Sequence, residues 1–275
     1  MRTMTGALGL YRVPIFAVSV LAGLMLFVPF LVLVATSWTS GSLLLFPPQG
    51  FSLRWYEQVL QDPKWMDPFF LSLGVSGVAT VIAVIFGTLG ALAVTRLSQR
   101  SARIVRTLFI VPIALPPVAY AIGLYGMNLE LGFLRGTLVT LILGEALIAL
   151  PYVFVLVSAA TGKLDPNLRN AAVTMGAPWT LVLRRVELPL LLPNILAGAI
   201  FAFSIVFDEV VLSVFLLPPG VVTLPMKMLS ASTEAFSPAL TATSTMVSLL
   251  ALIVLALFAW FSQASARRTR KAASK

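Results

Sequence analysis

Long apolar stretches, separated by short segments that carry most of the charged residues, dominate this sequence. An α-helix needs about 20 apolar residues to cross a bilayer. Six stretches meet this length, at residues 14–36, 71–94, 104–127, 137–160, 194–217 and 240–262. The pattern predicts an all-α polytopic membrane protein with six transmembrane helices. Residues 1–264 are expected to form a single membrane domain, and residues 265–275 a basic cytoplasmic tail.

Three of these spans carry local features that bear on packing. The first apolar run has about 23 residues, whereas the apolar core of a signal peptide has about 7–15, so we expect this run to remain as a helix. The second span has Ala83, Gly87 and Ala91 at four-residue spacing, which permits close helix packing, most simply within one subunit. The third has three prolines between residues 112 and 117. They predict a kink that either lines a cavity or is held by packing alone.

Composition supports the membrane assignment and limits the kinds of disulfide, metal and catalytic site that the chain can form. Of the 275 residues, 59% are hydrophobic and 11% are charged, which is too few polar residues to cover a soluble domain of this size. The chain has no cysteine and no histidine, which excludes disulfides, thiolate metal sites and histidine bases. We therefore expect no metal site and no bound cofactor in this chain.

The basic residues are distributed unevenly around the predicted spans. Of 19 lysines and arginines, only Arg54, Lys64, Arg135 and Lys227 fall on one side of the membrane, and the other 15 fall on the opposite side. Because basic loops are retained in the cytoplasm, both termini are expected to be cytoplasmic. The net charge of +9 is then a topology signal and a contact with lipid headgroups, not a nucleic-acid footprint.

The cytoplasmic loop 163–193, between spans four and five, is more structured than a simple connection needs to be. Asp165 and Pro166 are typical of a helix N-terminus, and Gly176 predicts the end of that helix. A second short helix is expected to begin at Pro178 and to end at Pro189. Two short amphipathic helices indicate either a docking surface for another protein, which we favour, or an interfacial element that rests on lipid.

This loop resembles the EAA loop of bacterial ABC importer permeases of the binding-protein-dependent, type I family. The motif reads Glu-Ala-Ala, three residues, Gly, nine residues, an aliphatic residue, any residue and Leu-Pro. Its counterparts here, with the alanine that follows the glycine, are Ala171, Ala172, Gly176, Ala177, Val186, Leu188 and Pro189. The resemblance implies a coupling helix that sits in a groove of an ATPase subunit. Asn170 stands where the family has glutamate, which puts in doubt a salt bridge from that position.

Segments 207–213 (FDEVVLS) and 223–227 (TLPMK) extend the resemblance to the spermidine/putrescine permease subfamily. It implies a multi-pass protein of the bacterial inner membrane that works with a second permease subunit, identical or paralogous. It also implies an extracytoplasmic substrate-binding protein and an ABC ATPase dimer that binds ATP and Mg²⁺. The subfamily also handles opines, aminoethylphosphonate and ferric iron, so these solutes remain alternatives to polyamines.

Three acids lie within the predicted spans, where ionisable residues are usually functional: Glu145, Asp208 and Glu209. At about 1.5 Å of rise per residue, Glu145 lies roughly 12 Å, Asp208 roughly 14 Å and Tyr120 roughly 10 Å from the outer ends of their spans. Acids without a basic neighbour favour a cationic substrate, and a tyrosine ring adds a cation–π face. Of the neighbouring residues Asp208 and Glu209, we prefer Asp208 as the contact to the substrate. Alternatively, the acids pair with a partner permease or remain protonated.

The motifs that are absent narrow the function. The sequence lacks GxxxxGK[ST], so ATP hydrolysis is expected in a separate subunit, and this chain is not expected to be an enzyme. It also lacks HExxH and GxSxG, which argues against an intramembrane hydrolase. We therefore expect a permease subunit of an ATP-driven importer, coupled through residues 165–189, with polyamines or related amines as cargo. A stand-alone channel or carrier is the weaker alternative.

Overall fold

The structure is a computed structural model, and it describes residues 4–234 and 237–273. Most of the described residues are helical, and the only β-type pairing among them is an isolated bridge between Thr39 and Phe51. They form two compact units, Met1–Pro63 with Ser230–Leu252, and Lys64–Leu229 with Ile253–Lys275. Both units draw on α11 (Leu224–Glu234) and on α12 (Pro238–Ala273).

The first unit contains α1 (Met4–Ser37) and α2 (Arg54–Gln61), joined by an irregular segment. The α2 helix is the short amphipathic element that precedes the long second apolar helix. The Trp55 Nε1–H and the Arg54 Nη2–H both donate to the Gly41 carbonyl, at 3.1 and 2.9 Å. A hydrogen bond of 2.5 Å between Ser37 Oγ and Tyr56 Oη joins the end of α1 to α2. These polar contacts hold the connecting segment against α2.

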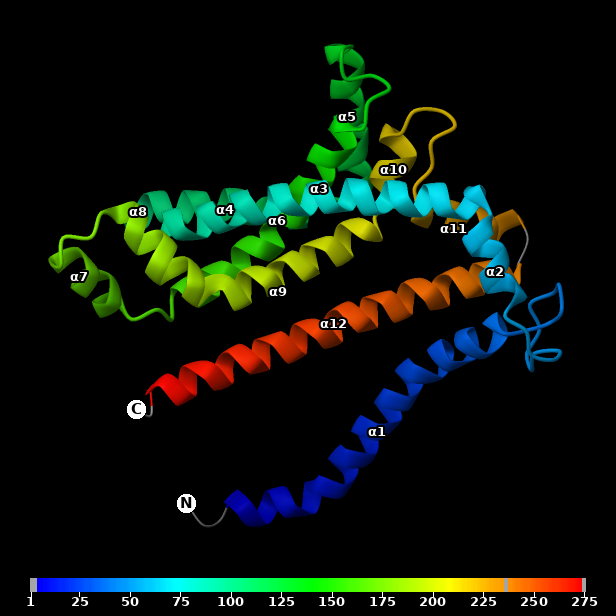
Figure 1. Cartoon of the computed structure of the whole chain (residues 1–275), viewed down its shortest axis with the longest axis horizontal. Helices are drawn as coiled ribbons and strands as arrows, with labels where there is room; N and C mark the ends of the chain where they lie inside the picture. The colour runs from blue at the N-terminus through cyan, green and yellow to red at the C-terminus, as the bar shows by residue number, and fades with distance from the viewer. Residues whose placement is uncertain (1–3, 235–236, 274–275) are drawn as a thin grey trace. The chain divides into compact units, whose positions relative to one another are not determined.

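The second unit is built on α3 (Pro63–Val94), α6 (Val139–Thr161) and α9 (Leu188–Phe207), and Figure 1 shows α6 and α9 packed side by side. Two glycines make this packing possible. A Cβ atom at Gly87 would lie 2.9 Å from Val153 Cβ, and one at Gly198 would lie 3.1 Å from Val153 Cα. The small-residue positions of the second span therefore pack within the subunit. Buried Val153, Phe154 and Leu191 belong to the core that these helices share.

The third predicted span, 104–127, is not one continuous helix. It consists of α4 (Gln99–Ala114) and α5 (Pro117–Leu131), and the chain bends by 101° between them (Figure 1). Leu115 and Pro116 between them have extended backbone angles. The prolines remove backbone donors and prevent the helix from continuing, so the expected kink is a sharp bend. The described chain has five helices that could cross a membrane, or six if this bent pair counts as one span.

The fifth predicted span, 194–217, also differs. Its helix begins earlier, because α8 (Trp179–Val182) continues through a π-helical turn, η1 (Leu183–Glu187), directly into α9. The expectation that Pro189 ends a separate short helix is therefore wrong. Proline clashes with the carbonyl four residues earlier, and the wider π turn relieves that clash without ending the helix. At its other end, α9 stops at Phe207, and α10 (Val211–Leu216) follows after a short break.

Candidate functional site

The loop between α6 and α9 begins with α7 (Pro166–Thr174), which lies at one end of the second unit (Figure 1). The Asp165 carboxylate caps its N-terminus by accepting a hydrogen bond of 2.9 Å from the Asn167 amide. At its other end Gly176 has φ +80°, and the Ala177 amide donates to the Ala172 carbonyl, as in a Schellman cap. The helix start and the glycine stop are therefore where the sequence places them.

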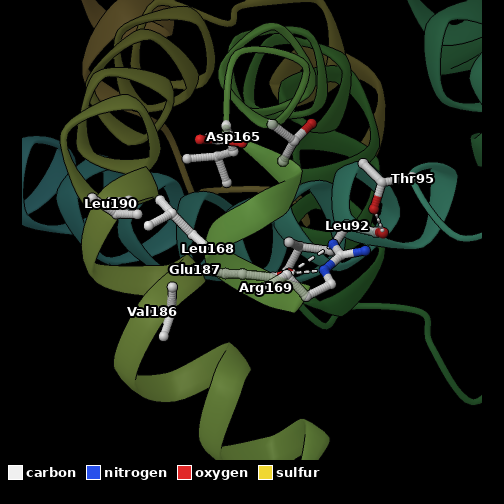
Figure 2. Close-up of a pocket in the computed structure, with 10 residues that line it drawn as sticks. Leu92, Thr95, Asp165, Leu168, Arg169, Val186, Glu187 and Leu190 are labelled. Atoms are coloured by element: carbon white, nitrogen blue, oxygen red, sulfur yellow. Dashed lines mark hydrogen bonds and ion pairs between the residues drawn. The ribbon is translucent and has the colours of Figure 1, made fainter. Parts of the chain in front are cut away.

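A buried carboxylate ties this loop to two other segments. Glu187, in η1, has a side chain that is 4% exposed, and its Oε2 lies 2.8 Å from Nη2 of Arg96, just beyond the end of α3. Its Oε1 accepts from Arg169 of α7, with Nη2 at 2.7 Å and Nε at 2.8 Å. Figure 2 shows Arg169 and Glu187 pointing toward one another from their two helices. We call Arg96, Arg169 and Glu187 the ion bridge.

The Trp179 ring packs against Arg96, one of the two arginines of the ion bridge. The Arg96 Cζ atom lies 3.2 Å from the centroid of the Trp179 ring, at the start of α8, so the guanidinium meets both a carboxylate and a π face. Burial lowers the pKa of Arg96 from its ordinary value, and the Glu187 carboxylate opposes that shift. The side chain stays charged because the ordinary pKa of arginine is so high.

A cavity of about 250 Å³ adjoins the ion bridge (Figure 2). Its walls come from the end of α3, the end of α6, α7 and the η1–α9 junction. The lining residues are Leu92, Thr95, Thr161, Leu164, Asp165, Leu168, Arg169, Val186, Glu187 and Leu190. Half of these lining residues are aliphatic, and on this side the ion bridge supplies charged contacts between α7 and the neighbouring segments.

The residues that the EAA resemblance marks fall into exposed and inward-facing groups. Asn170, Ala171, Gly176 and Pro189 are exposed, Ala172 is buried, and Ala177, Val186 and Leu188 are half-buried. Between them, Val173 and Met175 are 55% and 81% exposed, so α7 presents apolar side chains outward. An exposed apolar surface of this kind is typical of an interaction site.

The acids predicted within the membrane lie around the α5, α6 and α10 packing. Glu145 of α6 is 2% exposed, and its Oε2 has no hydrogen-bond partner among the described residues. The preceding residue, Gly144, accepts a hydrogen bond of 3.2 Å from the Tyr120 hydroxyl of α5. Glu209 lies in the break between α9 and α10. Its Oε1 accepts from the Val211 amide at 2.7 Å, at the start of α10.

Asp208 differs from its neighbour Glu209. Asp208 stands at the C-terminal cap of α9 and is exposed. Glu209 is half-buried, and its carboxylate accepts a hydrogen bond from the backbone at the start of α10. The structure thus brings Tyr120, Glu145 and Glu209 together and leaves Asp208 on the surface of the chain. Among the described residues, no group of three or more His, Cys, Asp or Glu side chains could hold a metal ion.

The ion bridge was not predicted from the sequence, although the sequence carries a signal for it. Glu187 is the only acid between Asp165 and Asp208, and it follows Arg184 and Arg185 directly before the Leu-Pro pair. A lone acid in a basic segment must be solvated or paired. Its partners could not be found from local spacing, because Arg96 lies 91 positions away in the sequence.

The family model described as "Binding-protein-dependent transport system inner membrane component" matches residues 83–271, most of the chain. The chain belongs to this family. It is 29% identical over 251 residues to the putrescine transport system permease protein PotI of Escherichia coli K12, covering 89% of both chains. It is 28% identical over 232 residues to the spermidine/putrescine transport system permease protein PotC of Haemophilus influenzae, covering 84% of this chain and 90% of that protein.

The fold is also that of solved ABC importer permeases. One is a chain of the bacterial alginate ABC transporter in complex with an alginate pentasaccharide-bound periplasmic protein, with a TM-score of 0.69 and 15% identity. The match covers 94% of this chain and 96% of that one. This protein is therefore a multi-pass membrane protein and a permease subunit of an ABC importer, which confirms the family expected from the EAA loop.

Proposed function

We propose that this permease imports polyamines or related small amines and forms half of their translocation pathway. The observation that carries the proposal is the relationship to PotI and PotC over most of the chain, because both are named as permeases for putrescine or spermidine. The chemistry of the predicted intramembrane site agrees with such a cargo, and the cytoplasmic loop provides a route for coupling to an ATPase.

The intramembrane acids suit a cation better than an anion. The sequences of α5, α6, α9 and α10 contain no lysine or arginine, while Glu145, Asp208 and Glu209 supply carboxylates on or next to them. A protonated amine can pair with a carboxylate and contact the face of Tyr120. Phosphate or sulfate would call for arginine or free backbone amides, which favours an amine as the transported solute.

Coupling to ATP requires partners. The chain has no phosphate-binding loop, so a dimer of ABC ATPase subunits would bind ATP and Mg²⁺, and α7 with its exposed Val173 and Met175 would dock on it. Both termini would then lie in the cytoplasm of a bacterial cell, in agreement with the distribution of basic residues. A second permease, identical or paralogous, would complete the pathway, and an extracytoplasmic binding protein would deliver the amine.

The deciding experiment is substrate-stimulated ATP hydrolysis by the complex reconstituted in proteoliposomes. The panel contains putrescine, spermidine, an opine, aminoethylphosphonate and ferric iron, each with its binding protein. We expect stimulation by a polyamine that weakens in Asp208→Asn and in Glu145→Gln. The control Glu57→Gln removes an exposed carboxylate of α2, outside the proposed site, and should change little. Stimulation by an anion or by iron alone would overturn the amine assignment while leaving the family assignment intact.

A further inference from the structure

We propose that Glu187 is a positioning residue that makes α7, the end of α3 and the start of α9 move together when the importer cycles. The proposal rests on the proposed coupling function of the loop and adds to it the side chains that transmit the motion. The EAA motif leaves position 187 open, so the acid there is a property of this chain, not of the motif.

The geometry joins three segments through one side chain. Arg96 follows α3, Arg169 lies in the middle of α7, and Glu187 ends the π turn that runs into α9. Each carboxylate oxygen of Glu187 is held by a different arginine, at 2.8 Å and 2.7 Å. All three residues belong to the same compact unit. A force on α7 therefore reaches two long helices through Glu187.

The surroundings make this link stronger than a surface ion pair. Exposed pairs contribute little because water competes for both charges, whereas the Glu187 side chain is 4% exposed. Removing its carboxylate charge would leave two guanidinium groups facing one another in a partly dry site. Removing one arginine would leave a buried carboxylate only half satisfied. Removing one member of a buried ion pair destabilises a protein more than replacing the whole pair with apolar residues.

The backbone around the ion bridge explains why such a link is needed. The π turn places one extra residue in the helix immediately before α9, and π turns of this kind are frequent at functional sites. Half of the residues that line the cavity beside α7 are aliphatic, and their contacts allow sliding because the hydrophobic effect has no preferred direction. The ion bridge supplies the directional contact that fixes α7 against the helices.

The chain offers a direct test, because it has no native cysteine. Spin labels at Leu97→Cys and Asn167→Cys, both exposed, would report the distance between the end of α3 and α7 in the assembled complex. We expect one narrow distance distribution that is the same without nucleotide and with ATP and vanadate. In Glu187→Gln the distribution should broaden or differ between the two states. An unchanged distribution in Glu187→Gln would overturn the proposal.

A second readout separates positioning from simple folding. The number of ATP molecules hydrolysed per amine transported should rise in Glu187→Gln, by a factor within the roughly 5- to 150-fold range of coupling effects, while basal hydrolysis persists. Glu187→Asp should restore most of the coupling. Arg169→Gln, which leaves the Arg96 pair intact, should uncouple α7 alone and widen the label distances. The control Arg103→Gln removes an exposed arginine of α4 and should change neither readout.

The label distances and the ratio of ATP hydrolysed to amine transported test different parts of the proposal. If no ATPase associates with the chain, the proposed coupling function fails, while the label distances of the chain in lipid nanodiscs still test whether Glu187 holds α7. If Glu187→Gln does not fold, Arg169→Gln and the double variant Arg169→Gln with Glu187→Gln replace it. Within the proposal, the double variant should be no worse than the more damaging single change, because each of the two changes already breaks the contact between Arg169 and Glu187. Additive effects would overturn the proposal.

Discussion

Arg96 and Glu187 lie 91 positions apart in the sequence, and their Nη2 and Oε2 atoms are 2.8 Å apart in the structure. The first follows the long helix α3, and the second ends the π turn that leads into α9. A third helix, α7, reaches the same carboxylate through Arg169. The loop between α6 and α9 of this permease is thus joined to the neighbouring helices through side chains as well as through its own backbone.

Replacing Arg96 with alanine should lower the stability of the second unit. The substitution removes an ion pair to a buried carboxylate and the contact with the Trp179 ring, and we expect a loss of about 1–3 kcal/mol, below the full buried-pair range because the Arg96 side chain is 30% exposed. The measurement is thermal unfolding of the purified chain in detergent. Arg100→Ala, at an exposed position of α4, is the control. Equal melting temperatures in the two variants would contradict the role of Arg96.

A methyl group at Gly87 should disturb the packing of α3 against α6. The new Cβ would lie 2.9 Å from Val153 Cβ and 3.2 Å from the Leu150 carbonyl oxygen, so the helices must separate. We expect Gly87→Ala to cost about 1–3 kcal/mol by overpacking. Gly77→Ala on the same helix meets nothing within 4 Å and should be neutral or slightly stabilising, because alanine is the better helix former. The comparison is made by thermal unfolding.

Gly176 should tolerate no side chain without strain. Its φ of +80° falls in the left-handed region, where a non-glycine residue costs about 1–3 kcal/mol. We expect Gly176→Ala to loosen the junction between α7 and α8, which limited proteolysis of the loop would detect as faster cleavage. Gly162→Ala is the matched change at the other end of the loop, where φ is −66°, and it should leave the cleavage rate unchanged.

A charge at Met175 should prevent association with the ATPase without unfolding the permease. Met175 is 81% exposed beside the C-terminal end of α7, so the unbound chain should tolerate Met175→Glu. Burial of that carboxylate in a docking groove would be strongly unfavourable. Co-purification of the ATPase is the measurement, and Met175→Leu is the control that keeps the apolar contact. Retention of the ATPase by Met175→Glu would place the docking surface elsewhere.

Much of the loop between α6 and α9 could be predicted from the sequence, because its signals are local. Asp165 and Pro166 mark the start of α7, and Gly176 marks its end, through contacts within one helical turn. The spacing that continues to Pro189 was sufficient to identify the family. The second helix begins with Pro178 as its N-cap, as expected. Its end at Pro189 was predicted wrongly, since a proline that stops a helix and a proline that follows a π turn look the same in sequence.

By itself, the sequence determined the helical class, most of the apolar spans and the bend between α4 and α5, because hydrophobic run length and missing proline donors act within a few residues of where they occur. Only the tertiary structure decided which charges meet. Glu187 lies between two arginines, and Glu145 is buried with one oxygen that has no hydrogen-bond partner in the described part of the chain, because packing brings distant segments together. Such pairings depend on how α3, α6 and α9 approach one another, which no local pattern specifies.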